Sequence, residues 1–235
     1  MTLRDAQGHP EPGRGMKLLI VGYGRMGRLV DALASERGIE VTGRIDVDGG
    51  DWDVAADVAI DFSTADALAV NFPRYVQLTL PVVIGTTGWA HLEGGFRAAA
   101  DGVGLGVVAS ANFSIGVNVF ELIVAEASRL MRQHPQFGAW IHESHDAAKC
   151  DAPSGTALLL RDAMTRAGYD RPVDVSSTRA GMAPGIHTVG FDGPSDTIEL
   201  THTARDRRGF ASGALFAAEW IRTRRGWYSM ADVLL

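Results

Sequence analysis

The fold is decided by the stretch Lys17-Leu18-Leu19-Ile20-Val21-Gly22-Tyr23-Gly24-Arg25-Met26-Gly27. An aliphatic run that ends in glycine is typical of a strand buried on both faces of a parallel sheet. Apolar residues at helical spacing continue to Gly38, and residues 40–45 predict a second strand. The stretch therefore opens a strand–helix–strand unit, with the pattern Gly-x-Gly-x-x-Gly in its first turn.

This glycine turn predicts a dinucleotide site. Gly22 and Gly24 allow the backbone to turn and approach a pyrophosphate, and Gly27 allows the helix to touch the sheet. We expect the whole turn to contact the cofactor, namely Gly22, Tyr23, Gly24, Arg25, Met26 and Gly27. The alternative is a glycine-rich turn that only tightens the packing of strand and helix.

Asp46 lies nineteen residues beyond Gly27, at the end of the second predicted strand. An acid at this place accepts hydrogen bonds from the adenosine ribose, which favours NAD over NADP. Arg44, with Arg25 or Arg28, can still receive a 2′-phosphate, so NADH and NADPH both remain open. Asp48 is the competing acid, and a plain turn role for Asp46 is the alternative.

Further short apolar strands are predicted at 58–62, 81–85 and 105–109, with Ala-rich helical stretches between them. Strands that alternate with helices predict a Rossmann-type, doubly wound parallel sheet of the α/β class. Polar turns follow two of these strands, where the carboxyl ends of a sheet converge on a cofactor. We expect cofactor contacts from these turns, which contain Gly85, Thr86 and Thr87, and Ala111, Asn112 and Phe113. Each can also be a simple turn.

The pattern changes near Ile115. A long amphipathic helix is predicted over 117–131, followed by strand-like segments at 137–142, 173–178, 187–191 and 197–204. Consecutive strands with few helices predict a smaller α+β domain with a mixed sheet. A last helix over 213–221 is expected to pack on the first domain. We thus predict a disordered extension 1–15, a dinucleotide-binding domain 16–114 with 209–235, and a substrate-binding and oligomerisation domain 115–208.

The composition narrows the function classes. The chain has 235 residues, 46% hydrophobic and 21% charged, as is ordinary for a globular protein. A net charge of −6 without a sustained basic stripe argues against a nucleic-acid partner. The absence of a transmembrane-length apolar run argues against a membrane protein. Cys150 is the single cysteine, which fits a reducing compartment, and we expect the cytoplasm.

The segment Glu143–Ala157 brings together groups suited to chemistry on a small anion. His145 can transfer protons near neutral pH, and Lys149 can hold a negative charge. Pro153-Ser154-Gly155-Thr156 predicts a turn into a helix, whose free N–H groups and dipole can hold a carboxylate. The alternatives are a hydrogen-bonded histidine at a strand end and a solvated lysine. A metal site is not expected, because His142 and His145 would face opposite sides of a strand.

The motifs together resemble the 4-hydroxy-tetrahydrodipicolinate (dihydrodipicolinate) reductase family of diaminopimelate and lysine biosynthesis. The match runs along most of the chain from Lys17, and the run Lys149 to Ala157 is its most specific part. The resemblance implies an oxidoreductase in which NADH or NADPH delivers hydride to a cyclic dicarboxylate. It also implies a homo-oligomer, commonly a tetramer and alternatively a dimer.

The resemblance also implies residue roles. Acid catalysis falls to His145 and Lys149. Substrate carboxylate contacts fall to Lys149, Ser154, Gly155 and Thr156. Cofactor contacts extend to Phe62, Ser63, Arg207 and Phe210, beside those already predicted.

One departure from the family lies within the site. The family usually has two adjacent histidines, and Asp146 stands in the second position, where we count it among the substrate-proximal residues. A carboxylate there repels a dicarboxylate unless it pairs with Lys149 or points away. A dehydrogenase of another small amino or oxo acid and a non-catalytic dinucleotide-binding protein are the alternative functions.

Overall fold

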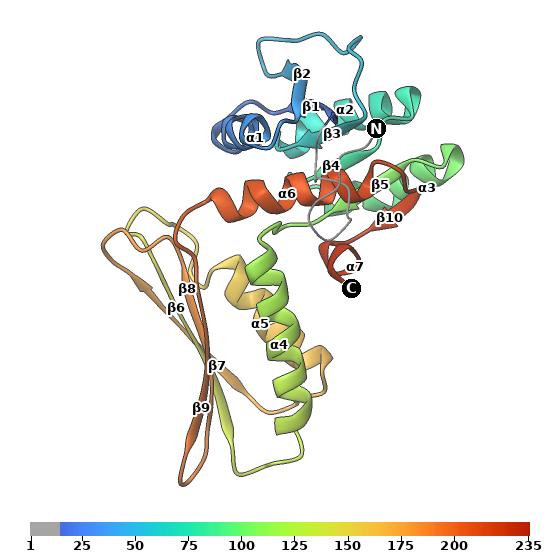
Figure 1. The fold of residues 1–235 in the computed structure, drawn as a ribbon. Coiled ribbons are helices and arrows are strands. Elements are labelled where there is room, and N and C mark those ends of the chain that lie inside the picture. Colours follow the sequence, from blue (N-terminus) through green and yellow to red (C-terminus); the bar gives the residue numbers. More distant parts are fainter. Residues whose placement is uncertain (1–14) are drawn as a thin grey trace, which may run out of the picture. The chain divides into compact units, whose positions relative to one another are not determined.

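The structure, a computed structural model, describes residues 15–235. Apart from Gly15, the predicted disordered extension therefore lies outside the described residues. The chain forms two compact units. Unit 1 contains the chain up to Ser114 together with Phe210–Leu235, and unit 2 contains Ile115–Gly209. Figure 1 shows the elements of each unit.

Unit 1 is built on a parallel sheet with the strand order β10-β5-β4-β3-β1-β2. β1 lies between β2 and β3, so the chain leaves the first strand to one side and returns on the other. This order confirms the predicted doubly wound sheet. The strands are β1 Lys17–Val21, β2 Glu40–Ile45, β3 Val58–Asp61, β4 Val82–Ile84, β5 Gly106–Ala109 and β10 Gly226–Tyr228.

Two apolar cores cover the two faces of this sheet. Leu18 and Ile20 of β1 belong to one core, and Leu19 and Val21 to the other, because successive side chains of a strand point to opposite faces. This explains why β1 is a continuous aliphatic run. The helical elements of the unit are α1 Arg25–Glu36, α2 Ala65–Leu78, η1 Ala90–Leu92, α3 Glu93–Val103, α6 Arg208–Ile221 and α7 Met230–Leu234.

The end of the chain differs from the sequence prediction. α6 begins at Arg208 and not at Gly213, because the carboxylate of Asp206 accepts the Arg208 backbone N–H and starts the helix earlier. β10 and α7 were not predicted. β10 spans Gly226–Tyr228, which is too short for a periodic pattern, and it pairs with β5 at the edge of the sheet.

Unit 2 contains a mixed sheet with the order β7-β6-β8-β9. β6 is parallel to β7 and antiparallel to β8, which confirms the predicted mixed sheet. α4 and α5 pack on one face over a core that includes Phe120, Leu160 and Phe191. The elements are α4 Ile115–Met131, β6 Gly138–His145, α5 Gly155–Arg166, β7 Val173–Arg179, β8 Ile186–Asp192 and β9 Thr197–Thr203.

β6 is longer than predicted. It continues past His142, paired with β8 as far as Ser144 and with β7 as far as His145. The predicted segment ended at His142, although His145 was already treated as strand-like when its face was compared with that of His142. Glu143 and His145 consequently point to the same, helix-covered face and are buried.

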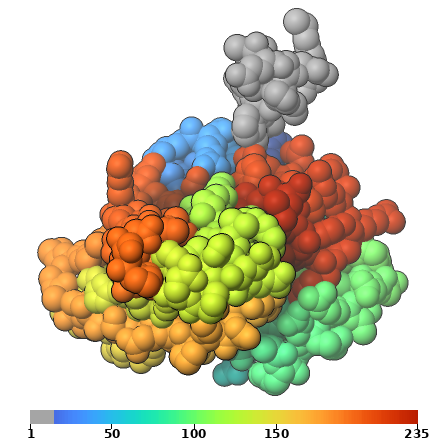
Figure 2. Space-filling model, turned by 90° about the horizontal axis from the view of Figure 1, so that it is seen from below, coloured from blue at the N-terminus to red at the C-terminus, as the bar shows by residue number. Residues whose placement is uncertain are grey.

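α4 also has an exposed apolar side. Val119, Ile123 and Leu130 are each more than a third exposed. The yellow-green atoms of this part of the chain are visible on the surface in Figure 2. α4 is nevertheless not a membrane helix, since none of the helices in the described chain is long and apolar enough to cross a bilayer.

Candidate active site

The glycine turn between β1 and α1 fits a dinucleotide. A Cβ on Gly22 would lie 2.5 Å from the backbone of Phe62, and one on Gly27 would lie 2.2 Å from the Gly22 carbonyl oxygen. Both glycines are therefore required by close backbone approaches. Beside Gly24, in contrast, no described atom lies within 4 Å of an added Cβ. Gly24 is also the N-cap of α1, and no described side chain caps that helix. The turn thus combines open space with N–H groups suited to a pyrophosphate.

Tyr23 and Arg44 are held together by Asp31 of α1. The Arg44 guanidinium donates two hydrogen bonds to the Asp31 carboxylate, at 2.7 and 2.8 Å, and the Tyr23 hydroxyl donates a third. The Arg44 hydrogen bond lowers the pKa of Asp31 against the opposing effect of burial. Arg44, predicted as one possible partner of a 2′-phosphate, is thus engaged by an acid of its own unit.

Asp46 follows β2 in a tight turn. Its backbone N–H donates to the Gly49 carbonyl, and its carbonyl accepts the Gly49 N–H. Between them, Val47 is 95% exposed. The turn therefore offers an acid at the end of the strand, followed by an apolar side chain.

Asp61 connects two of the predicted cofactor turns. Its buried carboxylate accepts hydrogen bonds from Ser63 after β3, from Thr86 after β4, and from the Tyr75 hydroxyl of α2. Burial, and then the charge of Asp61, raise the pKa of Tyr75 well above its usual value. The phenol therefore remains a hydrogen-bond donor to Asp61. Sequence analysis did not assign Asp61 a role, although it ends an apolar strand as an acid.

Several of the remaining predicted cofactor residues follow the carboxyl ends of β3, β4 and β5 in unit 1. The Phe62 ring occupies the space where Gly85 would carry a Cβ, and it meets Phe113 edge to face. Beside them lies a cavity of about 600 Å³, whose lining includes Thr86, Thr87 and Ala111. The Asn112 side chain accepts the Ser114 N–H. Arg25 and Arg207 are exposed, and Met26 and Phe210 are partly exposed.

The centre of the site in unit 2 is Glu143, whose side chain is fully buried. The Arg179 guanidinium donates to both carboxylate oxygens, at 2.8 and 2.7 Å. His145 Nδ1 lies 2.5 Å from Oε2, and the Ser154 N–H donates to Oε1 over 3.1 Å. Burial raises the pKa of Glu143, but the hydrogen bonds from Arg179, Ser177, His145 and Ser154 outweigh it and lower the pKa to about 2. Glu143 is therefore a carboxylate at neutral pH.

His145 has a partner on the neighbouring strand. The rings of His145 and His187 meet edge to face, with centroids 5.0 Å apart. His187 Nε2 lies 3.0 Å from the Ser154 hydroxyl, which accepts the Ala157 N–H and caps α5. Burial and then the charge of His145 lower the pKa of His187 to about 4. His187 is therefore neutral at physiological pH and is part of the support of the site.

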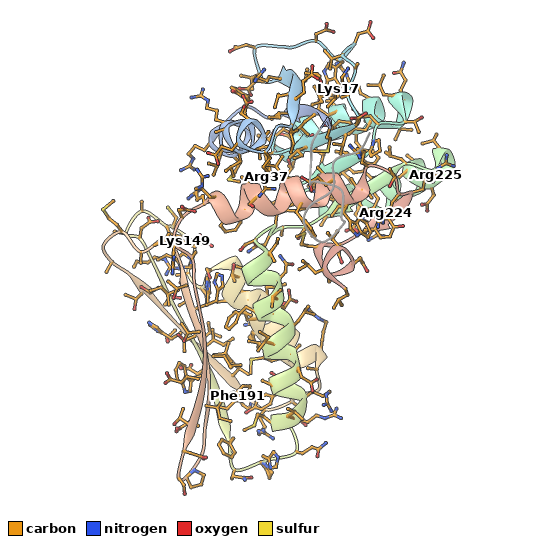
Figure 3. The ribbon with its side chains drawn as sticks, viewed as in Figure 1. Lys17, Arg37, Lys149, Phe191, Arg224 and Arg225 are labelled. Atoms are coloured by element: carbon orange, nitrogen blue, oxygen red, sulfur yellow. The ribbon has the colours of Figure 1, made fainter. Side chains whose placement is uncertain are left out.

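Lys149 lies in the loop after β6, and Figure 3 shows it at the opposite end of unit 2 from Phe191. Its ammonium group lies 2.7 Å from the carboxylate of Asp151. The Lys149 hydrogen bond lowers the pKa of Asp151, with smaller contributions that include the Gly155 backbone N–H. The Asp151 carboxylate therefore already contacts the Lys149 ammonium group and the Gly155 N–H, both of which were predicted to hold the substrate.

Asp146 does not pair with Lys149. Its carboxylate accepts the N–H of Ala148, two residues on, and so stabilises its own turn. Its carboxylate thus has a local role within the loop. Gly155, by contrast, has no described atom within 4 Å of an added Cβ, so the first turn of α5 has space beside it.

Sequence analysis gave no role to Glu143 or Arg179, and it left open whether His187 packs within the domain or binds a carboxylate. Alternation of buried residues from Ala139 would have placed Glu143 and His145 on one face, had β6 been extended by three residues. Arg179 has no comparable signal, because only strand pairing brings it opposite His145. His142 lies on the other face, with Nδ1 2.9 Å from the Ser176 hydroxyl. No group of metal-ligating side chains gathers among the residues of the described chain.

Comparison with known proteins decides the family. The family model described as dihydrodipicolinate reductase, N-terminus, matches residues 16–113, and that of the C-terminus matches residues 116–234. The chain belongs to the dihydrodipicolinate reductase family. The predicted resemblance is therefore confirmed, and with it the class of oxidoreductase that uses a nicotinamide dinucleotide.

Curated relatives match this dihydrodipicolinate reductase family member over nearly their whole length. The 4-hydroxy-tetrahydrodipicolinate reductase of Christiangramia forsetii is 33% identical over 93% of this chain and 98% of that protein. The enzyme of the same name from Rhodopseudomonas palustris BisA53 is 35% identical over 93% of this chain and 96% of that protein.

A solved structure shares the fold of this family member. Dipicolinate-bound dihydrodipicolinate reductase from Paenisporosarcina sp. TG-14 matches with a TM-score of 0.79 at 18% identity, over 94% of this chain and 99% of that chain. An amine dehydrogenase from Mycobacterium smegmatis matches with a TM-score of 0.57 at 10% identity, over 94% and 96% of the two chains. At these identities the likeness concerns the fold.

Proposed function

We propose that this chain reduces 4-hydroxy-tetrahydrodipicolinate to tetrahydrodipicolinate in diaminopimelate and lysine biosynthesis, with His145 and Lys149 at the reacting centre. The family and the curated relatives of that name support the reaction. The observation that carries the residue assignment is the buried Glu143–His145 pair beside the N-terminus of α5. Through Glu143, the proposed proton donor His145 is connected to the N-terminus of α5, the proposed carboxylate-binding site, within unit 2.

The chemistry requires an acid. The conversion removes the 4-hydroxyl as water and adds one hydride and one proton. The nicotinamide cofactor would supply the hydride when bound, and its addition to the conjugated ring left by the loss of water creates carbanion-like charge that a proton must quench. His145 Nδ1 faces the Glu143 carboxylate, which leaves Nε2 as the nitrogen that donates. Lys149 is the cation for a substrate carboxylate, and it can also donate a proton. It stabilises negative charge as that charge forms.

The substrate contacts follow from the loop and helix after β6. Gly155 and Thr156 begin α5, where backbone N–H groups and the helix dipole favour a carboxylate. The Ser154 side chain caps this helix by accepting the Ala157 N–H, so we propose that it stabilises the helix start and does not bind the substrate directly. The cyclic dicarboxylate dipicolinate is bound in the related structure from Paenisporosarcina. A small cyclic dicarboxylate is therefore the substrate class that we propose here.

We further propose that NADH is preferred over NADPH. Asp46 supplies a ribose-binding acid, and the next residue, Val47, offers no charge to a 2′-phosphate. Arg44 would have to leave Asp31 to provide one, at the cost of two hydrogen bonds. NADPH use therefore requires rearrangement that NADH use does not.

The oligomeric state that we propose is a homotetramer, with a dimer as the alternative. In unit 2, α4 and α5 cover only one face of the sheet. On the other face lie Trp140, which rests on Gly190, and Thr188, bonded to Thr201. A second sheet could bury this uncovered face. Cytoplasmic location is proposed on the basis of the pathway and the exposed thiol of Cys150.

The test of the function is an initial-rate assay with freshly prepared dihydrodipicolinate synthase product, using NADH and NADPH separately. We expect turnover with both cofactors and a higher kcat/KM with NADH. Absence of turnover above background would count against the reaction, and activity only on other amino or oxo acids would favour another dehydrogenase.

Lys149→Ala tests the assignment of the cation. We expect kcat to fall by roughly 100-fold or more, because both charge stabilisation and carboxylate binding are lost. NADH affinity, measured by fluorescence titration, should change little. The matched control is Arg161→Ala, an exposed cation on α5. An unchanged rate for Lys149→Ala would contradict its role.

A further inference from the structure

Arg179 contacts the supports of three proposed functional groups in unit 2. It is the last residue of β7 and is paired in register with His145 of β6. Its planar guanidinium donates to both oxygens of Glu143, at 2.8 and 2.7 Å. A fork of this kind fixes the plane of the carboxylate as well as its position.

The first support is that of His145. Glu143 Oε2, which accepts one hydrogen bond from Arg179, also lies 2.5 Å from His145 Nδ1. Because Glu143 is ionised and can only accept, Nδ1 must carry a proton. The orientation and the tautomer of the His145 ring are thus set by a carboxylate whose own orientation is set by Arg179.

The second support is that of the anion-binding helix end. Glu143 Oε1 accepts one hydrogen bond from Arg179 and another from the backbone N–H of Ser154, the N-cap of α5. The position of the helix start is consequently coupled to the same carboxylate that holds His145.

The third support is that of the lysine loop. Nη2 of Arg179 donates to the Asp151 backbone carbonyl over 2.6 Å. The side chain of Asp151 in turn holds the Lys149 ammonium group at 2.7 Å. One guanidinium therefore bridges the strand that carries His145 and the loop that carries Lys149.

We propose that Arg179 is a positioning residue that sets the proton donor, the substrate cation and the carboxylate-binding helix end in mutual register. The proposal rests on the roles of His145 and Lys149 proposed above. Arg179 acts through Glu143 and Asp151 and has no contact of its own with the reacting atoms. A lysine at this position would keep the charge but lose the fork that spans the three acceptor oxygens of Glu143 and Asp151.

The central experiment compares Arg179→Lys with wild type. We expect kcat to fall by roughly 10- to 100-fold, as is usual when a partner that orients a functional group is lost. KM for NADH should stay within about twofold, because the cofactor site of unit 1 keeps its own contacts. The matched control is Arg166→Lys, whose guanidinium pairs with Glu121 in the same unit. Wild-type kcat in Arg179→Lys would overturn the proposal.

Glu143→Gln gives a second readout, one that a purely structural role would not alter. The charged and titratable groups that lie against His145 are Glu143 on its own strand, Arg179, its paired residue on β7, and His187 on β8. The amide of Gln can present an N–H as well as an oxygen to Nδ1, so the neutral His145 ring should no longer be held as the Nδ1–H tautomer, which long-range ¹H–¹⁵N spectra report. Arg179→Lys keeps the carboxylate and should keep that tautomer. An unchanged tautomer in Glu143→Gln would contradict the coupling.

A measurement on the wild-type protein keeps the proposal testable even where a variant fails to fold. It also tests the positioning role independently of the proposed reaction. In the ¹⁵N-histidine-labelled chain, long-range ¹H–¹⁵N spectra report which ring nitrogen carries the proton. The proposal requires a protonated Nδ1 on His145 when the ring is neutral. An Nε2–H tautomer would overturn it whatever the substrate is, whereas correct tautomer without turnover would reject only the reaction.

Discussion

For the cofactor contacts proposed in unit 1, the hydrogen bonds that a residue already makes to its neighbours decide whether its side chain is available. Arg44 and Asp46 are two positions apart in sequence, and sequence alone left both as candidates for the ribose end. Arg44 turns to Asp31 of α1, with a bidentate geometry that no local pattern announces. Asp46 continues into a turn that closes on Gly49. The glycine turn was predictable because its backbone approaches demand the missing Cβ, whereas the partner of Arg44 depends on the packing of a helix.

Asp46→Ala tests whether this single carboxylate contacts the adenosine ribose. We expect kcat/KM with NADH to fall by roughly 10- to 100-fold, because a hydrogen bond to a charged acceptor is worth about 1.5–3 kcal/mol. The kcat/KM value with NADPH should change less, so the preference for NADH over NADPH, expressed as the ratio of the two kcat/KM values, should decrease. Steady-state kinetics with each cofactor measure this, with Asp48→Ala as the control. If the ratio of the two kcat/KM values does not change, Asp46 serves only the turn and does not contact the cofactor.

At the scale of elements, the composition of the proposed catalytic segment was predictable from the sequence, but its geometry was not. The mixture of His145, Lys149 and the helix start was visible in sequence. The extension of β6 was not, because pairing with β7 and β8 overrides the polarity of residues 142–145. The partners that lie on other strands, Arg179 and His187, are separated from His145 by more than thirty residues. Such contacts depend on strand register, which sequence patterns specify only weakly.

These paired strands predict that the free energy of unfolding decreases at acidic pH. His187 is held neutral in the folded chain, with its pKa lowered from 6.5 to about 4. Protonation therefore favours unfolding, and stability present above about pH 6.5 declines as pH falls toward 4, by about 3 kcal/mol at most. Glu143, whose pKa is lowered from 4.5 to about 2, adds a further loss below about pH 4.5.

Urea midpoints between pH 8 and pH 4 measure this loss. His187→Asn removes the titrating ring, so its midpoint should fall less steeply than that of wild type between pH 6.5 and 4. His134→Asn, at an exposed position after α4, is the control and should follow wild type. Equal slopes in all three proteins would show that His187 does not titrate with unfolding.

For the whole molecule, the proposed assembly rests on the uncovered sheet face of unit 2. We expect Thr188→Arg to lower the oligomeric state, because a charged side chain in the middle of a buried sheet face would lack a partner. Light scattering after size-exclusion chromatography gives the mass. The control is Val70→Arg, on the exposed side of α2 in unit 1. A tetramer unchanged by Thr188→Arg would place the interface elsewhere.

The Lys149–Asp151 pair has a consequence for substrate recognition. Because Asp151 lies two residues from Lys149, it is a tethered competitor present at a constant, high local concentration. If Lys149 binds a substrate carboxylate as proposed, that carboxylate displaces Asp151 and does not meet a bare cation. Binding is then an exchange between two like ligands, in which the Coulomb energy largely cancels. Under this proposal, the fit of the second carboxylate and of the ring distinguishes the substrate from other anions.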